Sequence, residues 1–261
     1  MNSSVPALRG TALIEAPART VAAAVAEPWL LRRAVSLVGV RLSARDGQLA
    51  VGDFVELSRF GWVVRLRVVA ADERGVLLTG DGVRLSATVV AGDAGTLLTC
   101  AVGGRLGRFV GRRLLPALLS EVRDRAEQLA TAQVVVGAVV RDGGTVLAAQ
   151  RARPPSAAGR WEFPGGRVEA GEDERCALVR ECREELTADV VVGERVGPDL
   201  VLPSGWVLRL YLAALAPGAQ PVAAEHRALR WVSADQFIEL DWLDADRIAL
   251  PAVADALAAK Q

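Results

Sequence analysis

The chain is poor in several residue types. Of its 31 basic residues only Lys260 is a lysine, there is one histidine, and aromatic residues make up 5% of the chain. Its three cysteines, Cys100, Cys176 and Cys182, are an odd number and are not clustered. This argues against a disulfide framework or a zinc site built on cysteine pairs, and we expect all three to be small core residues in a reducing compartment.

Long hydrophobic runs are also missing. Hydrophobic residues make up 51% of the chain, yet no run approaches the roughly 18 apolar residues that a membrane span needs. The longest runs, such as Val134 to Val140, have the length of a strand. The first residues do not read as a basic stretch followed by an apolar one, as a secretory signal would. We therefore expect a soluble, cytoplasmic protein without a membrane partner.

Charge is balanced overall but not between the two halves. Residues 1–131 carry 17 basic and 12 acidic residues, whereas residues 132–261 carry 14 basic and 19 acidic residues. An acidic second half suits a cation site better than a nucleic-acid groove, which would need a basic stripe. We expect two domains, 1–131 and 132–261, and no nucleic-acid partner.

The first half predicts an antiparallel meander followed by one long helix. Short β-type segments are separated by turns such as residues 80–82, and apolar residues repeat at helical spacing from about Phe109 to Ala130. Before the meander, Thr20 to Ala26 reads as a short helix that ends at Pro28, and Val35 to Leu42 reads as a strand.

This order of elements resembles the helix-grip fold of the START-like superfamily. The resemblance covers about residues 3–130 and concerns architecture alone. It implies that an apolar ligand could lie between the sheet and the long helix. The alternative is a filled core that serves stability or dimerisation, and the oligomeric state stays open.

The second half is organised around a glycine-rich turn and a helix. The turn occupies residues 164–171, and residues 172–186 contain neither Gly nor Pro. Within the second segment, Leu178, Cys182 and Leu186 recur every four residues. That spacing places them on one stripe of a helix, which can face a core.

A neighbouring stripe of this helix carries three carboxylates, Glu181, Glu184 and Glu185. Like charges four residues apart cost about 0.2–0.5 kcal/mol, and negative charge near a helix C-terminus opposes the helix dipole. One explanation is a solvated face on which Arg180 pairs with Glu184. The other is a hard divalent cation such as Mg²⁺, which takes carboxylate oxygens and substrate phosphates as ligands.

The segment resembles the Nudix box, which reads Gly, five residues, Glu, seven residues, Arg-Glu, an apolar residue, any residue, Glu-Glu, any residue, Gly. The residues that match in register are Gly166, Glu172, Arg180, Glu181, Cys182, Glu184 and Glu185. Thr187 stands where the family has Gly, which would suit a left-handed helix end, so the cap could differ. The resemblance implies an α/β/α sandwich with a mixed sheet, and hence a two-domain α+β protein.

The resemblance also implies a metal site and a reaction, the hydrolysis of a phosphoanhydride. Mg²⁺, with Mn²⁺ as a substitute, would be held by the Gly166 carbonyl, Glu181 and Glu185, with Glu184 as a further ligand and catalytic residue. Glu172 is expected beside this site or at a second metal. Arg180 would orient the carboxylates through its two-pronged guanidinium.

Further marks resemble the MutT-like subgroup, which includes oxidised-dGTP and CTP pyrophosphohydrolases. They are Ala149 to Arg151, Trp161 to Gly166, Glu225 to Trp231 and Leu243 to Arg247. By this resemblance Glu225, six residues before a tryptophan, would be a metal ligand or general base, so its loop must fold over the box. His226 looks exposed beside it and is not expected to be a catalyst.

The same resemblance suggests substrate contacts. Arg151 would contact phosphate and base, Phe163 would pack on the base, and Asp246, expected just before the final helix, would read the base edge. A carboxylate accepts hydrogen bonds, for instance from the exocyclic amine of cytosine. This favours cytosine nucleotides or a purine with an amino group; the alternative for Asp246 is a helix N-cap.

The predicted function is therefore Mg²⁺-dependent hydrolysis of (deoxy)nucleoside triphosphates to monophosphate and pyrophosphate, in nucleotide-pool sanitation or CTP turnover. Two alternatives remain open. The substrate could be ADP-ribose or another nucleoside diphosphate derivative, or the protein could be a non-catalytic nucleotide or ligand sensor.

Overall fold

The computed structural model describes residues 7–44 and 48–259. These form two compact units, the first ending at Ala132 and the second beginning at Gln133. The remaining residues of the two predicted domains, 1–6, 45–47 and 260–261, lie outside the described residues. None of the described helices is long and apolar enough to cross a membrane.

The first unit is a seven-stranded antiparallel sheet with three helices. The strands follow the order β1-β7-β6-β5-β4-β3-β2. In chain order the elements are β1 (Leu8–Ile14), α1 (Ala18–Val25), α2 (Pro28–Ser36), β2 (Arg41–Ser43), β3 (Phe54–Arg59), β4 (Trp62–Asp72), β5 (Gly75–Gly80), β6 (Val83–Gly92), β7 (Gly95–Gly104) and α3 (Arg105–Ala130).

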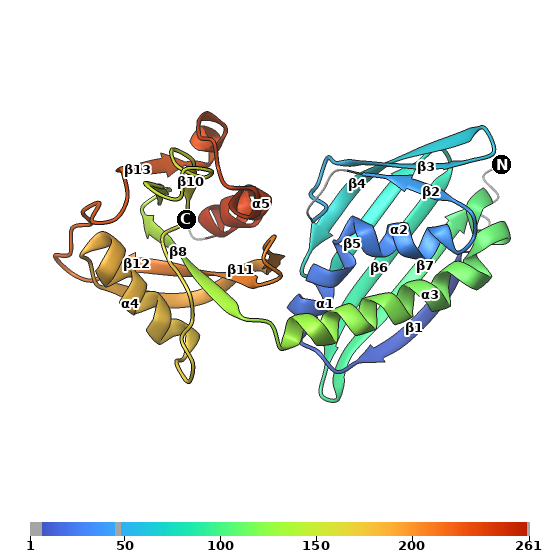
Figure 1. Ribbon diagram of the computed structural model, residues 1–261, viewed down its shortest axis with the longest axis horizontal. Helices are drawn as coiled ribbons and strands as arrows, with labels where there is room; N and C mark the ends of the chain where they lie inside the picture. Colours follow the sequence, from blue (N-terminus) through green and yellow to red (C-terminus); the bar gives the residue numbers. More distant parts are fainter. Residues whose placement is uncertain (1–6, 45–47, 260–261) are drawn as a thin grey trace. The chain divides into compact units, whose positions relative to one another are not determined.

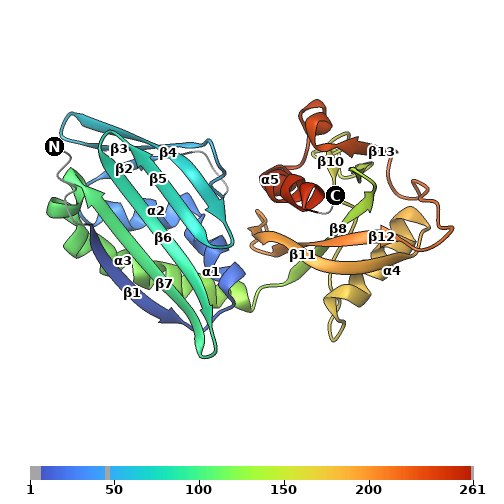
Figure 2. The ribbon, with the colours of Figure 1, turned by 180° about the vertical axis from the view of Figure 1, so that it is seen from behind.

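The helices of this unit cover one face of its sheet, as Figure 1 shows. Side chains such as Leu57, Leu66 and Leu98 are buried and alternate along the strands with more accessible ones. Leu114 and Leu129 of α3 are buried as well, and this helix packs on β1 and β7. The opposite face carries no helix of the described residues (Figure 2). The meander and the long helix are those predicted, whereas a START-like relationship stays a prediction.

The segment before the meander differs from the prediction. Pro28 follows the end of α1 and is also the first residue of a second helix, α2. Proline suits this position because the first residue of a helix needs no N–H for a bond within the helix, and because the proline ring already fixes a helical φ. Leu30 and Ala34, four residues apart, are buried on its inner face. Consequently Val35 to Leu42 is not a strand, and only Arg41–Ser43 forms β2.

The second unit is a mixed sheet between helices. Its strands follow the order β10-β9-β8-β12-β11, with β13 also paired to β9, and β12 runs parallel to β8. The elements are β8 (Val134–Asp142), β9 (Thr145–Gln150), β10 (Trp161–Glu162), α4 (Glu174–Leu186), β11 (Val190–Val201), β12 (Val207–Leu215), β13 (Ala228–Ser233), the 3₁₀ helix η1 (Ala234–Glu239) and α5 (Asp244–Ala258).

Two separate hydrophobic cores lie on the two faces of this sheet. One joins α4 to the sheet through residues such as Leu178 and Leu186, and the other joins α5 and η1 to it through residues such as Val253 and Phe237. Both helices are visible on opposite sides of β11 and β12 in Figure 1. The predicted fold class, α+β with an antiparallel and a mixed sheet, is confirmed.

Candidate active site

Helix α4 begins and ends with well-defined caps. At its start the Asp173 carboxylate accepts hydrogen bonds from the amides of Arg175 (2.9 Å) and Cys176 (3.4 Å). At its end Thr187 adopts the left-handed conformation, with φ 53° and ψ 31°, and its amide donates to the Arg183 carbonyl at 3.0 Å. The threonine therefore makes the same kind of cap that the family glycine would favour.

One face of α4 is buried and the other displays carboxylates. Leu178, Cys182 and Leu186 are fully buried, as their spacing predicted. Cys176 is exposed, so its prediction as a core residue is wrong; it lies near the helix start, off the buried stripe. Burial of one stripe fixes the rotation of the helix, and this points Glu181, Glu184 and Glu185 away from that core.

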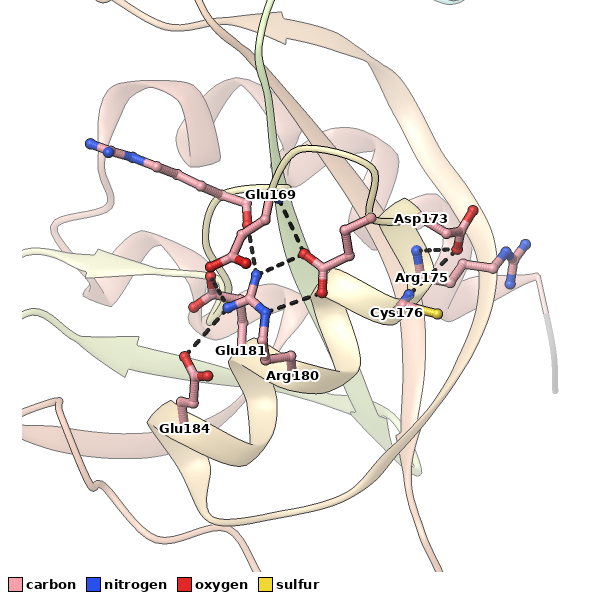
Figure 3. A network of polar contacts seen from close by, with 9 residues as sticks. Glu169, Asp173, Arg175, Cys176, Arg180, Glu181 and Glu184 are labelled. Carbon is pink, nitrogen blue, oxygen red and sulfur yellow. Dashed lines mark hydrogen bonds and ion pairs between the residues drawn. The ribbon is translucent and has the colours of Figure 1, made fainter.

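Arg180 gathers the carboxylates around one guanidinium, as Figure 3 shows. Its Nε and Nη2 reach the two oxygens of Glu172 at 3.1 and 3.0 Å, a two-pronged contact. Its Nη1 contacts Glu181 at 2.9 Å and Glu184 at 3.4 Å. The hydrogen bond from Arg180 lowers the pKa of Glu172. The predicted Arg180–Glu184 pair is thus present too, but it is the longest of these contacts.

The glycine-rich turn lies against the carboxylates of α4. The Gly165 amide donates to Glu185 Oε2 at 2.9 Å. A Cβ atom on Gly166 would overlap the Glu181 carboxylate, so a larger residue here would displace that side chain from its present position. The Gly166 carbonyl already accepts a hydrogen bond from the Val136 amide at 2.8 Å. Because a carbonyl oxygen has two lone pairs, one remains for another partner.

These groups line a cavity of about 730 Å³ in the second unit. Of the residues predicted for the site, those that line it are Arg151, Phe163, Gly166, Arg180, Glu181, Glu184, Glu185 and Asp246. Glu172 is not among the described residues that line the cavity, but it contacts Arg180, which does line it. Glu225 is exposed and lies outside the set of described residues that line the cavity. Its loop nevertheless meets α4, because the Ala224 amide donates to the Glu185 carbonyl at 3.0 Å.

Two residues of the site were not predicted. Glu162 lines the cavity and its carboxylate binds Arg151 Nη1 with one oxygen and His226 Nε2 with the other, the latter at 3.1 Å. The side chain of His226 is only 4% exposed, so its prediction as an exposed loop residue is wrong. The signal for Glu162 was a charged residue inside the apolar stretch Trp161 to Pro164.

Asp246 lies inside the final helix and not just before it. It is the third residue of α5, not the residue before the helix, and Leu243 occupies the N-cap position, so the N-cap alternative is wrong. Asp246 is 4% exposed and accepts a hydrogen bond from the Phe163 amide at 3.1 Å. Phe163 in turn packs against Trp242 in a tilted arrangement, with ring centroids 5.0 Å apart. Burial and the charge of Glu162 raise the pKa of Asp246 to about 7.

The electrostatics of the cavity favour a cation. Burial, with smaller effects of Glu162 and Glu181, raises the pKa of Glu185 to about 7, and burial also raises the pKa of Glu181. Within residues 7–44 and 48–259, no three His, Cys, Asp or Glu side chains are already grouped as a metal site. The donor set, carboxylates and carbonyl oxygens with excess negative charge, fits a hard divalent cation. The Glu184 side chain is exposed and contacts Arg180 at 3.4 Å.

Comparison with known proteins identifies the class. The NUDIX domain model matches residues 131–252. A Mycobacterium tuberculosis protein named "Putative 8-oxo-dGTP diphosphatase 2" is 56% identical over 117 residues, which cover 44% of this chain and 82% of that protein. The "CTP pyrophosphohydrolase" of Escherichia coli K12 is 39% identical over 113 residues, covering 43% of this chain and 84% of that protein.

Among solved structures, the solution structure of the E. coli ORF135 protein matches with 37% identity and a TM-score of 0.43, covering 49% of this chain and 92% of that one. The family model and the curated relatives define a hydrolase that acts on phosphoanhydride bonds. The chain belongs to the Nudix family, through its second unit.

Proposed function

We propose that the second unit hydrolyses nucleoside triphosphates to monophosphate and pyrophosphate with Mg²⁺, Mn²⁺ being able to replace it. The observation that carries this proposal is that one cavity is lined both by the carboxylates of α4 and by Arg151, Phe163 and Asp246. The first group is suited to a cation and phosphates, the second to a nucleotide. The names of the two curated relatives support a triphosphate substrate.

The carboxylates would hold the cation, which would neutralise phosphate charge and lower the pKa of an attacking water. Glu181, Glu184 and Glu185 with the Gly166 carbonyl are the proposed ligands. Arg180 contacts Glu172 and Glu181 at the same time, so its pairing with Glu172 helps to hold the Glu181 carboxylate in place. It would release Glu184, its weakest contact, when a cation binds.

Glu225 is proposed as a further ligand or as the general base. Its side chain is exposed, and the backbone of its loop is already attached to the end of α4 through Ala224. A general base must reach the attacking water directly or through one further water, and such contacts are often long in enzymes without substrate. We therefore propose that the Glu225 carboxylate moves toward Glu185 when substrate binds.

The nucleotide end of the cavity supports recognition of an amino-bearing base. Phe163, backed by Trp242, offers an aromatic surface on which a base can pack. Asp246 can accept a hydrogen bond from the exocyclic amine of cytosine or guanine. We therefore propose CTP-type nucleotides or 8-oxo-dGTP as substrates, with Arg151 contacting the bound nucleotide.

The test is turnover of a nucleotide panel by the full chain with Mg²⁺, with products resolved by chromatography. Monophosphate plus pyrophosphate from 8-oxo-dGTP, CTP or dCTP supports the proposal. AMP plus ribose phosphate from ADP-ribose would point to a diphosphate substrate, and binding without turnover would point to a sensor. Glu185→Gln should abolish turnover, while Glu194→Gln, on an exposed side chain of β11, should not.

For the first unit we propose a separate helix-grip domain with a filled core. The cavity between α3 and the sheet measures about 40 Å³ and is lined by apolar residues such as Leu78, Leu85 and Leu118. Ligand pockets are usually about 300–1,000 Å³, so an apolar ligand would need the core to open. Titration of the full chain with a fluorescent fatty acid tests this, and saturable binding would contradict a filled core.

A further inference from the structure

The imidazole of His226 is buried, although the residue lies in a surface loop between β12 and β13. Its side chain is 4% exposed, whereas its neighbours Glu225 and Arg227 are exposed. Nε2 lies 3.1 Å from Glu162 Oε1, and Nδ1 is buried without a hydrogen-bond partner among the described residues. Burying an imidazole that makes one hydrogen bond costs free energy, so a role for this contact beyond filling space is expected.

The loop that carries His226 is attached to two different elements. On one side Ala224 donates to the carbonyl of Glu185, at the end of α4. On the other side the Arg227 amide donates to the Gln150 carbonyl, at the end of β9, at 2.8 Å. The imidazole therefore stands between the helix that carries the proposed cation ligands and the strands that carry the nucleotide side of the cavity.

The residue that His226 contacts is on that nucleotide side. Glu162 lies in β10 and precedes Phe163, whose amide is bound by Asp246. Its second oxygen is held by Arg151. With both oxygens bound, the carboxylate has one orientation in the cavity; without His226, one oxygen of a largely buried carboxylate would lose its partner.

We propose that His226 is a positioning residue that fixes the Glu162 carboxylate and thereby links nucleotide binding at the Phe163 side to cation binding at the Glu185 side. This inference rests on the proposed function for the identity of the ligands. The link works in both directions, because a loop held by Glu162 also holds the backbone next to Glu185, and such coupling is reciprocal for binding.

The experiment compares His226→Leu, which removes the donor at similar volume, with His226→Gln, whose amide can still donate to Glu162. Arg227→Ala is the matched control, because it alters an exposed neighbour and keeps the backbone bond to Gln150. Calorimetry measures the affinity for Mn²⁺ alone, and separately for CMP and dGMP in EDTA, so neither readout needs turnover. We expect His226→Leu to weaken both affinities about tenfold, the scale of one hydrogen bond to a charged group.

Two further results decide the mechanism. His226→Gln should recover most of both losses, and Arg227→Ala should match the wild type. Adding His226→Leu to Glu162→Gln should cause little further loss of monophosphate affinity, because residues that act through one contact are not additive. If His226→Leu unfolds by circular dichroism, the comparison of His226→Gln with His226→Asn, whose shorter amide cannot reach Glu162, replaces it.

Wild-type affinities in folded His226→Leu, or full additivity with Glu162→Gln, would overturn the inference while leaving the hydrolase intact. A loss of monophosphate affinity with unchanged Mn²⁺ affinity would also overturn it, since the link to the cation would be absent. Conversely, a wild-type protein that hydrolyses no nucleoside triphosphate refutes the proposed function, while the Mn²⁺ and monophosphate titrations still decide the role of His226.

Discussion

Thr187→Gly should stabilise the second unit. Thr187 has a positive φ of 53°, and its side chain is exposed, so the substitution removes no buried surface. An L-residue in this conformation costs about 1–2 kcal/mol, whereas glycine loses about 0.5–1 kcal/mol more backbone entropy on folding. The difference is a net gain of about 0.5–1 kcal/mol. For a unit of this size, that gain raises the melting temperature by roughly 2–5 °C.

Thermal unfolding of the full chain, followed by calorimetry, measures this shift. The matched control is Thr131→Gly, because Thr131 also caps a helix C-terminus but has φ −106° and donates its hydroxyl to the Gln128 carbonyl at 3.0 Å. There glycine relieves no strain and should lower stability by about 0.5–1 kcal/mol. A Thr187→Gly protein that melts at or below the wild-type temperature would refute the assignment of strain to this cap.

Three other substitutions have defined outcomes. Gly166→Ala should weaken Mn²⁺ binding and reduce turnover about 100-fold, because the added methyl group displaces Glu181. Gly144→Ala, which has open space around it, should change neither property. Equal effects of the two substitutions would refute displacement of Glu181 as the cause. Arg180→Lys should lower turnover about 10–100-fold, since an ammonium group cannot replace the two-pronged contact of the guanidinium with Glu172. Unchanged rates would contradict a positioning role of Arg180. The folded-state pKa of Asp246 is raised to about 7, so its proton is lost more easily on unfolding and stability falls as pH rises from about 4 to 7. Asp246→Asn should reduce this fall in urea unfolding and leave the part that Glu185 contributes through its own raised pKa, and a pH profile parallel to that of the wild type would argue against it.

The sequence predicted local features of the site well because they depend on helical spacing. The stripe of Leu178 and Cys182 determined which way α4 faces. The resemblance implied that Arg180 would orient carboxylates, but that Glu172 is its two-pronged partner became visible only in the structure. Gly166 was assigned through the motif, and its steric reason is visible only in the structure, where an added Cβ would overlap the Glu181 carboxylate.

Contacts between distant segments were not predictable in this way. Glu162 and His226 are 64 residues apart, and nothing in their spacing shows that a loop would bury its histidine against a strand. The error at Val35 to Leu42 has a different cause. Only Val35 and Ser36 belong to α2, the chain then turns at Gly39, whose φ is 71°, and β2 begins at Arg41. A positive φ of this kind interrupts both a helix and a strand, so the apolar run is divided between local structures.

The uneven compensation of the carboxylates indicates where a cation gains most. Arg180 neutralises Glu172 and Glu181 at 2.9–3.1 Å, and it reaches Glu184 only at 3.4 Å. Glu185 accepts a hydrogen bond from a neutral donor, the Gly165 amide, and is more buried than Glu181; the nearby His226 offsets only part of the effect of burial on its pKa. A buried carboxylate that is poorly paired holds a proton more readily, which is why its pKa lies near 7. A divalent cation beside Glu185 would replace that proton. Glu185, which Arg180 does not contact in the hydrogen bonds given above, is therefore the carboxylate on which the proposed metal site depends most.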